Sequence, residues 1–166
     1  MRKKDIERRT SKVREIIKGA CEFAQVSPPQ VSCQLFFRGR PMRTFVWGMY
    51  LPIEKKGWVL VNVAKSFYIP TTLHEVAHHI HWIKFKLKAE KRKSRNDKRD
   101  HPLIFLKILF KLACWYYKGK PEKYPIKTEY PFLRRPWKKL LKNYKKGLDK
   151  AGGLWYNILH NMGEKK

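Results

Sequence analysis

The feature that most constrains this chain is the pentapeptide His74-Glu75-Val76-Ala77-His78. On a helix, residues four apart leave the same face with Cβ atoms about 5 to 6 Å apart, so both imidazoles can reach one metal ion. Glu75 lies about 100° further round the helix, beside such an ion rather than on it. The neighbours Leu73, Ile80 and Ile83 are apolar. This composition predicts a buried helix whose polar side chains need hydrogen-bond partners or a metal.

The spacing of these residues is that of a catalytic zinc half-site. His74 and His78 are the predicted zinc ligands. Glu75 is the predicted general base, taking a proton from a zinc-bound water whose pKa the metal lowers to about 7. A catalytic zinc has three protein ligands and one open position, so the chain must supply a third ligand from elsewhere.

Several residues after the motif are possible third ligands. His79 points about 140° away from His74, and His81 continues along the same helix axis, where three ligands cannot easily surround one ion. His101 is favoured because it opens the next apolar segment, which can pack back on the metal helix. The acidic residues of the intervening segment stay open as alternatives. The set considered is His79, His81, Glu90, Asp97, Asp100 and His101.

The charge balance predicts an anionic partner. The 39 Lys and Arg residues exceed the 13 Asp and Glu residues, which leaves a net charge of +26. The excess gathers in residues 2–18, 84–99 and 118–150, with net charges of +5, +7 and +9. Nucleic acid, with DNA preferred, is the expected partner of this basic surface. A solvated basic surface and an anionic membrane face are the alternatives.

One segment mixes aromatic and basic residues in a way that suits nucleic-acid binding. In Tyr130-Pro-Phe-Leu-Arg-Arg-Pro-Trp137 the rings are candidates for stacking on exposed bases while the cations hold phosphates. An ordinary amphipathic connector is the competing interpretation.

Length and composition favour one intracellular domain. The chain has 166 residues, 43 % of them hydrophobic, which is enough for a core. Cys21, Cys33 and Cys114 form no CxxC pair, as expected in a reducing compartment. The most apolar run, residues 102–117, is shorter than the roughly 20 residues of a membrane span. No secretory signal is recognisable, and a cytoplasmic or nucleoid-associated location without a membrane partner is expected.

The first half of the chain predicts a helix followed by strands. Residues 5–20 have the period of an amphipathic helix, which Ser27-Pro28-Pro29 ends. Residues 31–37, 44–51 and 58–63 have strand character, and the turns between them favour an antiparallel meander.

The second half is predicted to be helical. The helix that carries His74 and His78 is predicted to start near Pro70 and to run past Ile83. Thr72 and Glu75 have the spacing of a capping box, but Glu75 cannot easily both cap the helix and act in catalysis, so the helix is expected to begin before Thr72. Residues 103–117 predict a mostly buried helix. Residues 119–136, which contain four prolines, predict an extended connector before an amphipathic helix that Gly152-Gly153 ends, and residues 154–162 suit a short last helix.

Two motifs together resemble a known family. His74 to His78, followed by His101-Pro102-Leu103-Ile104-Phe105, is similar to the SprT-like metalloproteases, which include Spartan. That family has HExxH and then a third zinc histidine in an HGxxF pattern that opens the next helix. The resemblance covers roughly residues 30–117. Pro102 stands where the family has glycine, the 22-residue insert between His78 and His101 is unusually basic, and no Cys-rich zinc ribbon follows.

The resemblance implies a zincin-like α+β fold. Its small antiparallel or mixed three-stranded sheet would pack with an N-terminal helix, the metal helix and a following helix. Residues 1–118 would form this core, and residues 119–166 a basic helical C-terminal extension on the same domain. It also implies Zn²⁺ on His74, His78 and His101, with Glu75 as general base of an endopeptidase acting on nucleic-acid-associated proteins.

Two other functions remain open. One is a nucleic-acid-binding protein whose zinc site is structural or degenerate; such sites are closed by four ligands and gain nothing from Glu75. The other is a zincin of the regulator-cleaving type with an acidic third ligand. The second electrophile and the oligomeric state are left open.

Overall fold

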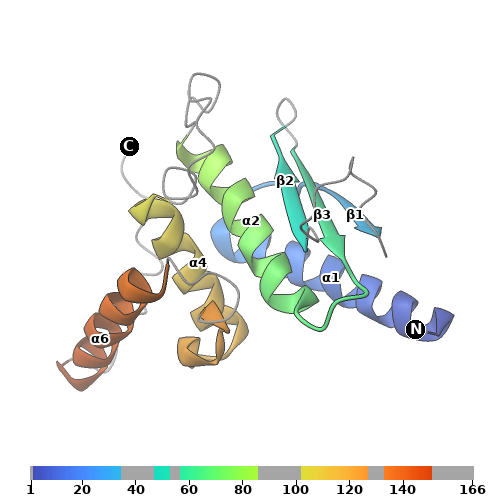
Figure 1. Cartoon of the computed structure of the whole chain (residues 1–166). Coiled ribbons are helices and arrows are strands. Elements are labelled where there is room, and N and C mark those ends of the chain that lie inside the picture. Colours follow the sequence, from blue (N-terminus) through green and yellow to red (C-terminus); the bar gives the residue numbers. More distant parts are fainter. Residues whose placement is uncertain (1, 35–46, 53–56, 86–101, 127–132, 151–166) are drawn as a thin grey trace. The chain divides into compact units, whose positions relative to one another are not determined.

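A computed structural model of the chain describes five stretches, namely residues 2–34, 47–52, 57–85, 102–126 and 133–150 (Figure 1). They form four α-helices and a mixed three-stranded sheet, so the predicted α+β class is confirmed for these residues. The chain divides into two compact units, residues 1–91 and 92–166, called unit 1 and unit 2 below. The division after residue 118 stays a prediction, and no described helix is long and apolar enough to span a membrane.

Unit 1 begins with the predicted amphipathic helix, α1 (Lys3–Ala24). Its buried face consists of Val13, Ile16, Ile17, Ala20 and Cys21. The helix ends where Gln25 takes the left-handed conformation, with φ of 54°. The amide of the following residue then donates to the carbonyl of Cys21 at 3.0 Å, which satisfies a carbonyl of the last turn.

The three strands are β1 (Gln30–Gln34), β2 (Gly48–Leu51) and β3 (Trp58–Asn62), arranged in the order β1-β3-β2. β2 runs antiparallel to β3, but β1 runs parallel to it, so the predicted meander is wrong. The reason is composition. β3 is apolar on both faces and takes the centre, whereas β1 alternates polar Gln30, Ser32 and Gln34 and suits an edge.

The two faces of the sheet differ in burial. Val59 and Val61 are fully buried on the face that α2 covers. Met49, Leu51 and Trp58 share the opposite face, as their cross-strand pairing requires, and each is more than a third exposed. The alternation expected for residues 58–63 is therefore confirmed through Val61, whereas Asn62 and Val63 are both buried.

The motif lies on α2 (Tyr68–Phe85), which packs against α1, β2 and β3 (Figure 1). As predicted, the helix begins before Thr72, whose hydroxyl donates to the carbonyl of Tyr68 at 2.6 Å instead of capping the helix. Arg9 of α1 fixes the entry to α2. Its guanidinium donates to the carbonyl of Val63 at 2.9 Å and lies 5.2 Å from the ring centroid of Tyr68.

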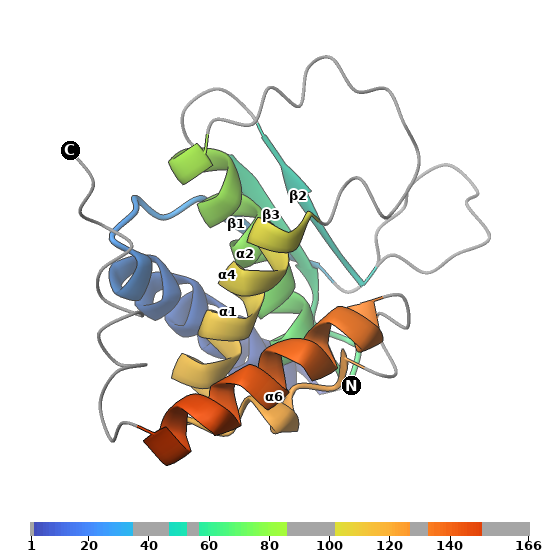
Figure 2. The same cartoon turned by 90° about the vertical axis from the view of Figure 1, so that its left-hand side faces the viewer.

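Unit 2 contains α4 (Leu103–Tyr116), a 3-10 turn η2 (Pro121–Lys123) and α6 (Arg134–Lys150). Figure 2 shows α6 crossing α4. Two corrections concern the connector. It contains the turn η2, and α6 starts two residues before Pro136, because proline is well tolerated in a first helical turn.

One of the rings expected to stack on nucleic-acid bases, that of Trp137, is buried in the structure. Its side chain is 1 % exposed, and its ring lies 5.0 Å from that of Phe110 and 5.2 Å from that of Tyr124. The helical period places this residue on the inner side of α6, so it cannot stack on a nucleic-acid base. The other rings of that segment lie outside the described residues.

Candidate metal centre

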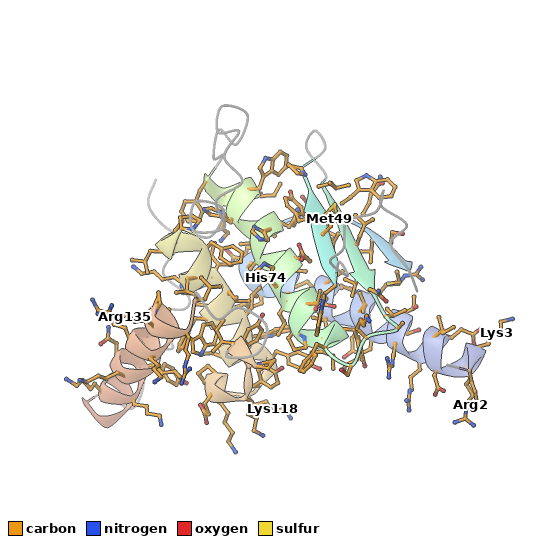
Figure 3. All side chains as sticks on the ribbon, viewed as in Figure 1. Arg2, Lys3, Met49, His74, Lys118 and Arg135 are labelled. Atoms are coloured by element: carbon orange, nitrogen blue, oxygen red, sulfur yellow. The ribbon has the colours of Figure 1, made fainter. Side chains whose placement is uncertain are left out.

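His74 and His78 lie one helical turn apart in the middle of α2, where Figure 3 labels His74. Their Nε2 atoms are 3.1 Å apart, and their ring planes are inclined at 73°. His74 is 3 % exposed, while His78 is half-buried. The pair therefore points two nitrogens at one place that is reached from the side of His78.

This geometry fits a shared tetrahedral ion. At Zn–N distances of about 2.0 to 2.1 Å and a tetrahedral angle, two ligand nitrogens lie about 3.3 Å apart. The observed 3.1 Å between the Nε2 atoms is close to that separation. Imidazole nitrogen is also a donor that zinc prefers. The two residues therefore fit as half of a zinc site.

Glu75 is buried beside the pair, with 6 % of its side chain exposed. It faces Gly48 at the start of β2. A Cβ on Gly48 would lie 2.5 Å from Cγ2 of Thr71 and 2.9 Å from Cγ of Glu75, distances that real Cβ atoms do not adopt. Glycine at this position therefore lets the strand backbone approach the helix and leaves room for the carboxylate.

Tyr50, two residues after Gly48 on β2, lies beside His78 and His79 of α2. Its ring is parallel to that of His78 within 4°, with centroids 6.5 Å apart. Its hydroxyl lies 3.3 Å from Nδ1 of His79. Burial raises the pKa of the Tyr50 phenol. β2 thus supplies a neutral ring that restricts the orientation of His78.

His79 points away from His74, as the spacing predicts. Its Nε2 lies 2.8 Å from the carbonyl of Ser27, which can only accept, so Nε2 carries the proton and Nδ1 accepts from the Tyr50 hydroxyl. Burial lowers the pKa of His79, partly offset by the hydrogen bond to Ser27. His79 is therefore a neutral histidine that ties α2 to the segment between α1 and β1 and to β2.

Among the residues whose structure is described, none supplies a third ligand beside His74 and His78. In that part of the chain, no three His, Cys, Asp or Glu side chains gather in an arrangement that could hold a metal. His81 is buried, with its ring 5.9 Å from that of Phe85, and does not complete a group with His74 and His78. The remaining ligands considered, Glu90, Asp97, Asp100 and His101, lie outside the described residues, so His101 stays a prediction.

Sequence reasoning did not single out Gly48 and Tyr50. A signal for Gly48 was present, because an isolated glycine inside a strand pattern often marks a close backbone approach. Nothing local distinguishes Tyr50 from the other seven tyrosines. Its position next to His78 follows from the pairing of β2 with β3, which brings residues 48–51 beneath α2.

The chain was also compared with known proteins. No family model matches it, and neither a curated protein nor a solved structure does.

Proposed function

We propose that this chain is a zinc-dependent endopeptidase that acts on proteins associated with nucleic acid. The observation that supports the proposal best is the paired Nε2 atoms of His74 and His78, 3.1 Å apart beside the buried Glu75. A structural zinc site needs no general base, whereas hydrolysis needs one, and Glu75 is in a position to serve. The resemblance of residues 30–117 to SprT-like proteases points the same way.

In this proposal His74, His78 and His101 would hold the ion. When bound, zinc would supply Lewis-acid activation of water and of the scissile carbonyl. Glu75 takes the proton from the attacking water as the new C–O bond forms. It then gives that proton to the leaving nitrogen as the C–N bond breaks, so one carboxylate serves as base and then as acid.

The neighbours of Glu75 determine where its carboxylate lies. Gly48 leaves space for the side chain, and the fixed turn of α2 holds it about 100° from the ligand face. Tyr50 restricts the ring of His78 from the strand side. A catalytic group held in this way does not need to be reoriented in each turnover.

The proposal is tested by cleavage of a DNA-bound protein substrate by the full chain, with and without DNA. Glu75→Gln should reduce the cleavage rate about 10²- to 10⁴-fold, the usual contribution of a general base, while zinc content is kept. A zinc chelator should abolish cleavage by the unchanged chain.

Glu7→Gln is the matched control, because it makes the same chemical change at an exposed glutamate of α1. It should cleave at the wild-type rate. Undiminished cleavage by a zinc-loaded Glu75→Gln variant would refute the assignment of the base.

A further inference from the structure

The outer face of α6 carries a dense row of cations. Between residues 134 and 146 the helix has seven basic side chains and no acidic one, and all seven are exposed. At 100° per residue they occupy an arc of about 140°. Figure 3 shows Arg135 projecting away from the ribbon. The seven are Arg134, Arg135, Lys138, Lys139, Lys142, Lys145 and Lys146.

The opposite side of α6 anchors the helix to unit 2. Trp137 packs between Phe110 and Tyr124, and the ring of Tyr144 lies 5.7 Å from that of Phe110. The Tyr144 hydroxyl also donates to the carbonyl of Gly119 at 3.3 Å. The cations are therefore displayed on a helix whose rotation about its own axis is fixed by packing.

Among the side chains that the structure describes in unit 2, these charges meet little compensation, because Glu122 is the only acidic one. Like charges four residues apart, such as Arg134 with Lys138 and Lys138 with Lys142, destabilise a helix by about 0.2 to 0.5 kcal/mol each. The two arginines also stand at the helix N-terminus, the positive end of its dipole. A polyanion lying along this face would relieve each of these repulsions.

We propose that the outer face of α6 binds the sugar-phosphate backbone of duplex nucleic acid without reading its sequence. Residues 134 to 146 span about 18 Å of helix, and a duplex presents one negative charge per about 1.7 Å of its axis. The seven cations thus lie along a length of duplex that carries about ten phosphates on its two strands together. Lysine and arginine contacts to phosphate add affinity without specifying bases.

The same face is poorly suited to other polyanions. Single-stranded nucleic acid is held by aromatic rings stacked on its bases, and the outer arc of α6 presents none, because Trp137 and Tyr144 are buried. A helix that lies in a membrane surface inserts its apolar side, and the apolar side of α6 is packed inside unit 2.

α6 lies outside the residues that resemble the protease family, so its charge is an independent observation. The inference gives the nucleic-acid partner of the proposed function a binding surface, and in that respect it rests on the proposed function. The test below measures binding to nucleic acid and not proteolysis. The α6 proposal can therefore be wrong while the protease proposal holds, and the protease proposal can be wrong while α6 still binds duplex.

The test compares two variants of the full chain that each lose four positive charges. The α6 variant carries Lys138→Gln, Lys139→Gln, Lys142→Gln and Lys145→Gln. The α1 control carries Lys4→Gln, Arg8→Gln, Arg14→Gln and Lys18→Gln, all at exposed positions. Both keep good helix formers at the changed positions.

Binding to a 24-base-pair DNA duplex is measured by fluorescence anisotropy over a range of salt concentrations. The α6 variant should bind at least about 30-fold more weakly at 0.1 M salt. Its log K against log salt slope should fall by about 3 to 4, since each phosphate contact contributes about 0.9. The α1 control should change less than about threefold.

Equal losses in the two variants would overturn the proposal, because net charge alone would then explain binding. Two other results would also overturn it: a 24-nucleotide single strand bound more tightly through α6 than the duplex, or phosphatidylserine vesicles bound in its place. A third variant, with the four α6 lysines changed to arginine, should bind like the wild type. If the glutamine variant loses its helical circular dichroism, Lys142→Gln alone should lower the salt slope by about 1.

Discussion

α2 and α6 are both helices of about four to five turns, yet they arrange their polar side chains in opposite ways. α2 turns polar groups inward: of its side chains, Thr71, Thr72, His74, Glu75, His79 and His81 are buried. α6 buries Trp137 and Tyr144 and turns its cations outward. The buried polar groups of α2 require hydrogen-bond partners inside the protein, whereas α6 has the usual distribution of an amphipathic helix, with apolar residues inside and charged residues outside.

The contrast indicates where chemistry and where recognition can occur. Buried histidines and a buried glutamate are costly unless hydrogen bonds or a metal satisfy them, and His79 shows one such solution through Ser27 and Tyr50. Exposed lysines cost little and are free to meet an anion. In our two proposals, catalysis therefore belongs to α2 and attraction of nucleic acid to α6.

The largest stability effect is expected on the inner side of α6. Trp137→Ala removes a fully buried ring from its contacts with Phe110 and Tyr124 and should lower the free energy of unfolding of unit 2 by about 3 to 5 kcal/mol. Chemical denaturation of the full chain, followed by circular dichroism, measures the change. Lys138→Ala, the next residue but exposed, should stay within about 0.5 kcal/mol. Similar losses for both would mean that α6 is not amphipathic in the way described.

A smaller effect is expected where β2 meets α2. Gly48→Ala forces a methyl group against Thr71 and Glu75, which should cost about 1 to 3 kcal/mol of stability. We also expect cleavage to fall about tenfold while zinc content is unchanged, because a misplaced base costs rate without removing a ligand. Thermal unfolding, metal content and cleavage rate are the readouts. Met49→Ala, on the opposite face of the same strand, is the control and should alter none of them strongly.

The smallest effect on stability is expected from the buried thiols, which behave alike in the two units. Burial raises the pKa of Cys21 in unit 1 and of Cys114 in unit 2 to about 12 from 9.0. Between these two pKa values the thiol is protonated in the folded chain and ionised in the unfolded chain. The contribution of each thiol to the free energy of unfolding is therefore complete below pH 9 and is lost as the pH rises toward about 12.

For Cys21, the loss at pH 10 amounts to about 1.4 kcal/mol, since the unfolded thiol is then ten-elevenths ionised. Denaturant titrations measure the free energy of unfolding at pH 8 and at pH 10. Between these pH values it should fall by about 1.4 kcal/mol less in Cys21→Ala than in the wild type. Identical drops in the two proteins would mean that the Cys21 thiol is accessible to water in the folded state.

Periodicity predicted the helices well because each has a distinct buried side. The apolar residues of α1 and the start of α2 before Thr72 follow from the sequence alone. The sheet was harder. Residues 31–34 and 58–62 have clear strand character, but their parallel pairing depends on which strand is apolar enough for the centre, a property of the whole sheet. Of the two interpretations of residues 130–137, base stacking is wrong for Trp137, because the helical period places its side chain on the buried side of α6.

At the site, the spacing of four residues was enough to predict that His74 and His78 converge, since it follows from helix geometry. The same reasoning predicts that the side chain of His79 points away from His74. Gly48 and Tyr50 could not be found in this way, because they reach α2 across a strand pairing between residues far apart in the chain. Local patterns predict what one helix presents, and tertiary contacts decide what meets it.

The central claim is one zinc ion held by three histidines, and metal content tests it most directly. We expect about one zinc per chain in the purified wild-type protein, measured by inductively coupled plasma mass spectrometry. His78→Ala and His101→Ala should each retain less than about a tenth of that amount, whereas Glu75→Gln should retain all of it. A zinc-free wild type, or full zinc content after loss of His78, would contradict the account.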